Sequence, residues 1–222
     1  MDAPWSVSAE VVVVVVGGPD RPADVVLPQN AVVIAADGGA ELAAELGLGV
    51  DLLVGDLDSV SADRVASSGR VERHPAAKDA SDFELALNAA LGLEPERIVV
   101  VGGAGGRLDH LLGGLLLLAA GDYAGVQVDA RLGDAVVHVL RGERRLAGTV
   151  GELISLFAVH GPAAGVVSEG LVYPLRGEVL EPGSSRGLSN LFAAPEAWIR
   201  VERGVVVAVR VNCSAAGESW CR

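Results

Sequence analysis

The sequence predicts an α/β protein with two parts: an N-terminal doubly wound, mostly parallel α/β domain and a C-terminal all-β sandwich. Two observations predict this fold class. In the first part, continuous blocks of Val, Ile and Leu alternate with helical patterns, as in strands that are buried on both faces and joined by helices. From about residue 143, short strand patterns separated by Gly and Pro replace the helices. We therefore place the α/β domain at residues 1–142 and the β domain at residues 143–222.

The predicted strands of the first domain are short apolar runs, most of them followed by residues that favour turns. They are Val11–Val16, Val32–Ala35, Asp51–Val54, Ile98–Val101, Val126–Ala130 and Ala135–Leu140. Helices are predicted between them at Gly39–Leu46, from Ser81 to about Leu91, and at Leu111–Ala120. Ser81 and Glu84 have the spacing of a capping box, which places the start of the second of these helices.

The predicted strands of the second domain are short and separated by Gly and Pro turns, and no helical pattern is convincing there. They are Leu153–Val159, Val166–Leu171, Leu188–Phe192, Trp198–Glu202 and Val205–Val211. Arg203-Gly204, between two apolar runs, is interpreted as the tip of a hairpin.

Composition excludes several classes of function. The formal net charge of −12 disfavours binding to nucleic acid or to anionic membranes, because both are negatively charged. Apolar runs are all far shorter than the roughly 20 residues that cross a bilayer. Cys213 and Cys221 lack the spacing of a metal site and are interpreted as incidental thiols. We expect a cytoplasmic protein with no nucleic-acid or membrane partner.

Acidic motifs follow the predicted strands of the first domain. Asp37 follows the second strand, Asp56 and Asp58 follow the third, and Lys78 and Asp82 precede a helix. Ligands of parallel sheets bind outside the carboxyl ends of the strands, so these side chains are expected to meet at one edge. Clustered carboxylates require a cation, and Mg²⁺ prefers their oxygens. Each motif alone also fits a turn or a helix cap. Their shared position favours a magnesium site.

A glycine-rich motif, residues 102–110, lies between a predicted strand and a predicted helix. Backbone N–H groups and the helix dipole favour phosphate at such a position, and Arg107 offers a bidentate donor. The motif is neither a P-loop nor a dinucleotide fingerprint, because its glycine spacing differs and no Gly-Lys-Ser/Thr ending is present.

Together these motifs resemble those of thiamine pyrophosphokinases. The resemblance rests on Ala36–Ala40, Gly55–Ser59, Lys78–Asp82 and Gly105–His110, and continues through Gly170–Leu175 and Gly187–Asn190. It implies an α/β catalytic domain, a β-sandwich that binds thiamine, and a homodimer with active sites at the subunit interface. It also implies the conversion of thiamine and ATP to thiamine diphosphate and AMP with Mg²⁺.

The resemblance also implies roles for individual residues. Those implied in catalysis are Asp37, Asp56, Asp58, Asp82 and Arg107, of which Asp56, Asp58 and Asp82 hold the metal. Those implied at ATP are Gly38, Gly39, Lys78, Gly105, Gly106, Arg107, Asp109 and His110. Those implied at thiamine are Asp82, Ser189 and Asn190, and Tyr173 is a candidate for stacking on the cationic thiazolium. Bacterial relatives commonly carry an acidic residue where this chain has Leu191.

Two other functions are compatible with the same motifs. One is a diphosphokinase that acts on another small alcohol, such as a hydroxymethylpterin. The other is a nucleotide or thiamine sensor without catalysis. The Tyr-Pro-Leu and Gly-Leu-Ser-Asn segments favour thiamine over a pterin, and the full set of aspartates favours an enzyme over a sensor.

Overall fold

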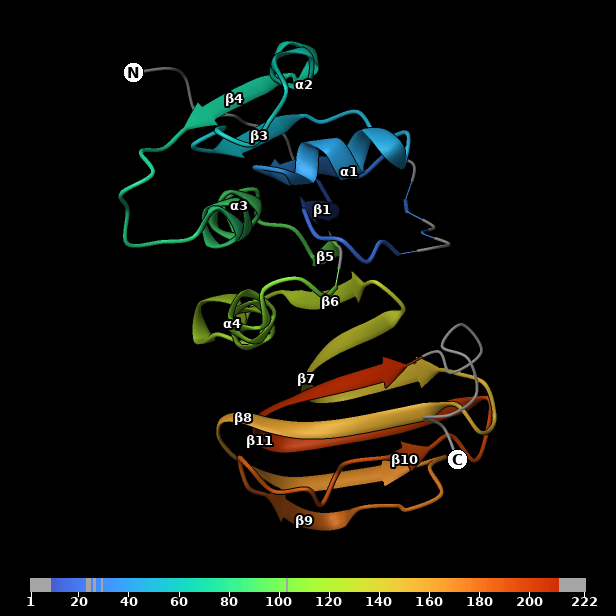
Figure 1. The fold of residues 1–222 in the computed structure, drawn as a ribbon. Coiled ribbons are helices and arrows are strands. Elements are labelled where there is room, and N and C mark those ends of the chain that lie inside the picture. The colour runs from blue at the N-terminus through green and yellow to red at the C-terminus, as the bar shows by residue number, and fades with distance from the viewer. Residues whose placement is uncertain (1–8, 23–24, 26, 29, 103, 212–222) are drawn as a thin grey trace. The chain divides into compact units, whose positions relative to one another are not determined.

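The structure is a computed structural model that describes residues 9–22, 25, 27–28, 30–102 and 104–211. It divides into two compact units (Figure 1). The first comprises residues 1–114 and 125–133, and the second comprises residues 115–124 and 134–222. Within the described ranges, no helix is long and apolar enough to cross a membrane.

The first unit contains a parallel sheet in the order β6-β5-β1-β2-β3-β4. The chain builds outward from β1 through β4, then returns to place β5 on the other side of β1. This reversal creates a topological switch point between β1 and β5, the position where such sheets bind ligands. The strands are β1 Val11–Val16, β2 Val32–Ala36, β3 Leu52–Gly55, β4 Arg70–Arg73, β5 Arg97–Gly102 and β6 Gln127–Leu132.

Helices cover this sheet. Leu42 and Ala43 of α1 pack against Val13, Val15 and Val33, which share one face of the sheet because side chains alternate along a strand. Helix α3 contacts β1, β2 and β3. Its start agrees with the predicted cap, because Ser81 Oγ accepts a hydrogen bond of 3.2 Å from Glu84 N. The helices are α1 Gly39–Glu45, α2 Ala62–Ser67, α3 Asp82–Leu91 and α4 Leu108–Leu118, followed by the 3₁₀ turn η1 Gly121–Tyr123.

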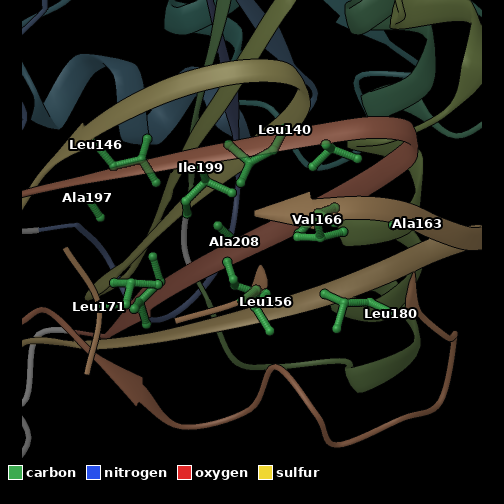
Figure 2. Packing of buried hydrophobic residues seen from close by; sticks show 14 of the residues in the cluster. Leu140, Leu146, Leu156, Ala163, Val166, Leu171, Leu180, Ala197, Ile199 and Ala208 are labelled. Atoms are coloured by element: carbon green, nitrogen blue, oxygen red, sulfur yellow. The ribbon is translucent and has the colours of Figure 1, made fainter. Parts of the chain in front are cut away.

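The second unit is an antiparallel sheet in the order β10-β8-β11-β7, with β9 also paired to β8. Its three long strands bend, and residues from both halves of β11, such as Ile199 and Ala208, contribute to one apolar core (Figure 2). The predicted all-β C-terminal region is therefore confirmed, and its strands are antiparallel. The strands are β7 Ala135–Ala147, β8 Leu153–Glu169, β9 Arg176–Leu180, β10 Asn190–Leu191 and β11 Glu196–Val211.

The structure corrects several element predictions. The predicted hairpin tip at Arg203-Gly204 is wrong, because both residues lie inside β11, where the pairing register shifts. Similarly, the strands predicted at Leu153–Val159 and Val166–Leu171 belong to one bent strand, β8, which ends at Glu169. Helix α2 and strands β4 and β9 were not predicted. Ala135–Ala147 is one continuous strand, and the compact units divide before it. The domain boundary placed after residue 142 stays a prediction.

Candidate active site

The predicted polar residues of the first unit follow its strands at the carboxyl edge of the sheet. Asp37 follows β2, Asp56 follows β3, and the glycine-rich turn that ends in Arg107 follows β5. Asp82 is the first residue of α3, which follows β4. The parallel arrangement of these strands explains why residues far apart in the sequence occur at one edge.

Three carboxylates form a compact group. Asp37, Asp56 and Asp58 each offer an oxygen, and these oxygens all lie within 4.8 Å of one another. Ser59 Oγ donates a short hydrogen bond to Asp37 Oδ2. Asp37 Oδ1 is buried and has no hydrogen-bond partner among the described residues. A buried carboxylate oxygen without a donor is costly, so this geometry suits a hard cation such as Mg²⁺.

The backbone of the two loops is specialised for this arrangement. Asp37 has φ +42° and Leu57 has φ +66°, a region that residues with side chains rarely adopt. Leu57 is buried in a small cluster with Ala35 and Leu53. Its apolar side chain therefore anchors the loop, while the flanking Asp56 remains half-buried and Asp58 exposed. Strained conformations of this kind are concentrated at functional sites.

Asp82 lies beside this group. A Cβ built on Gly55 would be 3.1 Å from Asp37 Cβ and 3.2 Å from Asp82 Oδ1, so a side chain at position 55 would push both aspartates away. Lys78 Nζ is 2.9 Å from Asp82 Oδ1. The contact is an ion pair between residues four positions apart. The structure thus groups Asp37, rather than Asp82, most closely with Asp56 and Asp58.

Charge interactions shift the pKa values of two groups in this site. The negative charge of Asp56, followed by desolvation and the charge of Asp37, raises the pKa of Asp58 above its ordinary value. The adjacent Asp82 carboxylate raises the pKa of Lys78. Both shifts indicate an excess of negative charge, which a divalent cation would neutralise.

The glycine-rich turn after β5 is held against the loop after β1. Asp20 N donates to Ala104 O at 3.0 Å, and Ala104 N donates to Asp20 O at 2.8 Å. Gly105 and Gly106 have φ +79° and +72°, and a Cβ on Gly105 would lie 2.4 Å from Asp20 Oδ2. The positive φ favours glycine at position 105, whereas the Asp20 carboxylate could move aside from a Cβ. This pairing closes the carboxyl end of the sheet at its switch point.

Arg107 and Asp109 form an exposed bidentate pair at the start of α4. Arg107 Nε and Nη2 lie 3.2 and 2.6 Å from the two carboxylate oxygens of Asp109. The hydrogen bond from Arg107 lowers the pKa of Asp109 to about 2. His110, next in the chain, is also exposed. The guanidinium group of Arg107 is accessible to a ligand from solvent.

Gly38 and Gly39 have a clear structural role. Gly38 caps the start of α1, and a Cβ on Gly39 would lie only 2.1 Å from the backbone oxygen of Val15. Gly39 therefore lets α1 approach β1 closely. Contact with ATP, as predicted from the sequence, stays a prediction.

The candidate thiamine residues lie in the second unit and differ in burial. Tyr173 and Ser189 are exposed, whereas Asn190 is buried. Ser189 has φ +56°, and its backbone N–H donates to Ser155 Oγ at 3.1 Å. The Asn190 side chain bonds to the backbone of Tyr173 and Leu191. Cys213 and Cys221 lie outside the described residues.

Sequence reasoning assigned no role to three residues that shape the site. Ser59 bonds to Asp37, Leu57 anchors the acidic loop, and Asp20 pairs with the glycine-rich turn. Ser59 was within reach of prediction, since a serine directly after Asp-x-Asp offers a hydroxyl to a neighbouring carboxylate. Asp20 carried no such signal, because its partner lies more than eighty residues away.

Two family models match the chain in succession. Residues 23–128 match the model described as "Thiamin pyrophosphokinase, catalytic domain". Residues 137–206 match "Thiamin pyrophosphokinase, vitamin B1 binding domain". The thiamine pyrophosphokinase of Bacillus subtilis is 28% identical over 167 residues, which span 70% of this chain and 76% of that relative.

Solved structures share the fold. A crystal structure of thiamine pyrophosphokinase from Bacillus subtilis has a TM-score of 0.80 at 23% identity and covers 91% of this chain and 99% of its own. One from Geobacillus thermodenitrificans has a TM-score of 0.76 at 24% identity and covers 96% of this chain and 100% of its own. The similarity therefore extends over both units of the chain.

Proposed function

Because this chain belongs to the thiamine pyrophosphokinase family, we propose that its carboxylate group handles the metal and phosphates during diphosphate transfer from ATP to thiamine. The products are thiamine diphosphate and AMP. The observation that carries this proposal is the convergence of Asp37, Asp56 and Asp58, with Asp82 beside them, at the carboxyl edge of the sheet.

The donor set fits Mg²⁺. Carboxylate oxygens are its preferred protein ligands, and the buried Asp37 Oδ1 lacks a partner among the described residues. We propose Asp56 and Asp58 as ligands, with Asp37 as the nearest further donor and Asp82 as the fourth carboxylate. When bound, Mg²⁺ would neutralise charge on the transferred phosphates.

Beyond holding the metal, the protein contributes to the reaction mainly by positioning the reacting groups. The thiamine hydroxyl oxygen forms a bond to the β-phosphorus, the bond from that phosphorus to the α–β bridging oxygen breaks, and AMP leaves. Arg107 and Lys78 would bind phosphate oxygens as charge develops on them. The hydroxyl proton passes to an aspartate, for which we propose Asp82, because it lies beside the three closely grouped carboxylates.

Gly38, Gly39, Gly105, Gly106, Asp109 and His110 complete the proposed ATP site. Their support is their position at the same edge of the sheet as the carboxylates. The first domain would thus bind ATP and metal, and the second would bind thiamine through Tyr173 and Ser189 and supply the dimer contacts. We also propose a cytoplasmic homodimer in which the thiamine residues of one subunit serve the carboxylates of its partner.

The direct test is AMP release. Purified protein is mixed with thiamine, ATP and MgCl₂, and the products are separated by chromatography. We expect AMP and thiamine diphosphate in equal amounts, and no product when EDTA removes the metal. Release of AMP with hydroxymethylpterin but not with thiamine would assign another acceptor. Binding of both ligands without AMP would identify a sensor.

A further inference from the structure

In the second unit, the segment Leu171–Leu175 carries the exposed aromatic ring of Tyr173 between two buried residues. Its two ends are buried: Leu171 points into the apolar core (Figure 2), and Leu175 is buried in the same cluster. Between them, Val172, Tyr173 and Pro174 are exposed, and Tyr173 is 58% exposed. The two buried leucines therefore anchor the segment on both sides of the exposed tyrosine.

The side chain of Asn190 forms hydrogen bonds to the backbone of this segment. Its Oδ1 accepts hydrogen bonds from Tyr173 N at 3.0 Å and from Leu191 N at 2.9 Å, and its Nδ2 donates to Tyr173 O at 2.7 Å. The side chain is only 4% exposed. An amide side chain has two donor hydrogens and two acceptor lone pairs, and three of these four are used here by backbone groups. The amide therefore faces the protein and not a ligand.

Ser168 forms hydrogen bonds to the other end of the segment, at Leu175. Its Oγ accepts a hydrogen bond of 2.9 Å from Leu175 N, and its backbone N–H donates to Leu175 O at 3.0 Å. Ser168 is buried as well. In addition, Val172 N donates to Leu191 O at 2.9 Å. The backbone on both sides of the Tyr173 ring is thus tied to buried groups, which restricts the positions that the ring can occupy.

We propose that Asn190 and Ser168 are positioning residues that hold the Tyr173 ring in place for the flat cationic ring of the acceptor alcohol, without touching it. This inference rests on the proposed function, since it assigns how the same site recognises its acceptor. A ring fixed before binding loses less conformational entropy when the ligand stacks on it. Asn190, expected from the sequence at thiamine, acts instead through the backbone of Tyr173.

The test is a double-mutant cycle in the full-length protein. Asn190→Ala and Tyr173→Ala are each expected to raise the KM for thiamine about tenfold, the scale of a lost cation–π contact. Ser168→Ala should raise it in the same direction. The KM for ATP and kcat at saturating thiamine are expected to change less than about twofold, because the phosphate chemistry lies elsewhere. Asn190→Ala added to Tyr173→Ala should cause no further loss.

Control variants separate positioning from general destabilisation. Ile199→Val removes a methyl group from the same core and should leave the KM for thiamine unchanged while lowering the melting temperature. Asn190→Asp keeps the acceptor for Tyr173 N and Leu191 N but sets a carboxylate oxygen against Tyr173 O, so it should also raise the KM for thiamine above that of wild type. It also serves where the alanine variant fails to fold.

Two results would overturn the proposal. Additive effects of Asn190→Ala and Tyr173→Ala would mean that Asn190 itself contacts the acceptor. An unchanged KM in Asn190→Ala would mean that the hydrogen bonds do not matter for binding.

Hydrogen exchange separates this inference from the proposed function. Asn190→Ala should speed exchange at Tyr173 N–H by at least about tenfold, whether or not the chain is an enzyme. Unchanged exchange at Tyr173 overturns the positioning role. Absence of AMP release by the wild-type protein overturns the proposed function instead.

Discussion

The carboxylates at the sheet edge influence one another, because the negative charge of each makes a negative charge on its neighbours less favourable. Asp56 and Asp58 flank the buried Leu57, and their oxygens lie within 4.8 Å of each other and of Asp37. Replacing either charge removes a key electrostatic group while the loop retains its anchor.

Asp56→Asn and Asp58→Asn are each expected to lower turnover by at least about a hundredfold, the scale of one such electrostatic group. The measurement is AMP release at saturating thiamine and ATP. Asp63→Asn, an exposed carboxylate on α2, is the matched control for the change in net charge and should retain wild-type activity. Near-normal turnover in both Asp56→Asn and Asp58→Asn would contradict the proposed metal site.

Asp58→Asn is expected to lower turnover, but the raised pKa of Asp58 predicts that the same substitution increases the stability of the metal-free protein. A carboxyl group whose pKa is higher in the folded state than in the unfolded state stabilises the fold below its unfolded pKa, and this contribution is lost as pH rises through the folded pKa. Metal-free Asp58→Asn should therefore melt at a higher temperature than wild type at neutral pH. The gain should shrink as pH falls through the raised pKa.

The same shift affects metal binding. Protons compete for Asp58 at a higher pH than for an ordinary aspartate, so Mg²⁺ affinity should weaken earlier as pH is lowered. Thermal melts in EDTA and in MgCl₂ across pH measure both effects. Equal melting temperatures for Asp58→Asn and Asp63→Asn in EDTA would contradict the proposed repulsion.

For single residues, the position in the fold was easier to predict from the sequence than the direction in which the side chain points. Placing Asp37, Asp56 and Asp58 together required only the rule that parallel strands end at one edge. The ion pair of Lys78 with Asp82 and the inward turn of Asn190 depend on side-chain directions set by tertiary packing. A sequence pattern does not contain that information.

Among the elements, α1 depends on close contact with β1. A Cβ on Gly39 would lie 2.1 Å from Val15 O, and a backbone oxygen cannot move aside as a flexible side chain can. Gly39→Ala is expected to lower the free energy of unfolding by about 1–3 kcal/mol, as overpacking does. Urea unfolding measures the change.

Gly49→Ala provides the control, because a Cβ there has no atom within 4 Å and the residue has no positive φ. Its effect should be small or slightly stabilising, by up to about 1 kcal/mol. Equal losses of stability in the two variants would show that contact with β1 does not explain the Gly39 effect.

Element types were more predictable than element ends. The valine block of β1 and the cap of α3 are local signals, and both were correct. In β11, Gly204 resembled a turn residue because a turn and a bend within a strand require the same backbone freedom. Pairing with β7 and β8 along both halves of β11 decided in favour of a bend, and that pairing is long-range.

For the whole molecule, the proposed dimer with shared sites predicts complementation between subunits that are impaired in different parts of the site. Co-expression of Asp56→Asn and Tyr173→Ala chains should restore about a quarter of wild-type activity at low thiamine, because half of a random dimer mixture is mixed and each mixed dimer has one intact site. AMP release by the purified mixture measures the recovery.

Co-expression of Asp56→Asn with Asp58→Asn is the matched control. Both changes affect the same half of the proposed site, so no activity should return. If the first pair shows no recovery above the activity of the Tyr173→Ala chain while light scattering shows a dimer, each subunit contains its own complete site.

The position of β11 has a consequence for synthesis on the ribosome. This strand lies between β7 and β8 in the sheet, yet it occupies residues 196–211 of a 222-residue chain. During synthesis, β7 and β8 therefore each carry an unpaired edge until β11, which follows both in the chain, has emerged from the exit tunnel. During that interval the growing polypeptide is exposed to aggregation, and chaperones have most to protect.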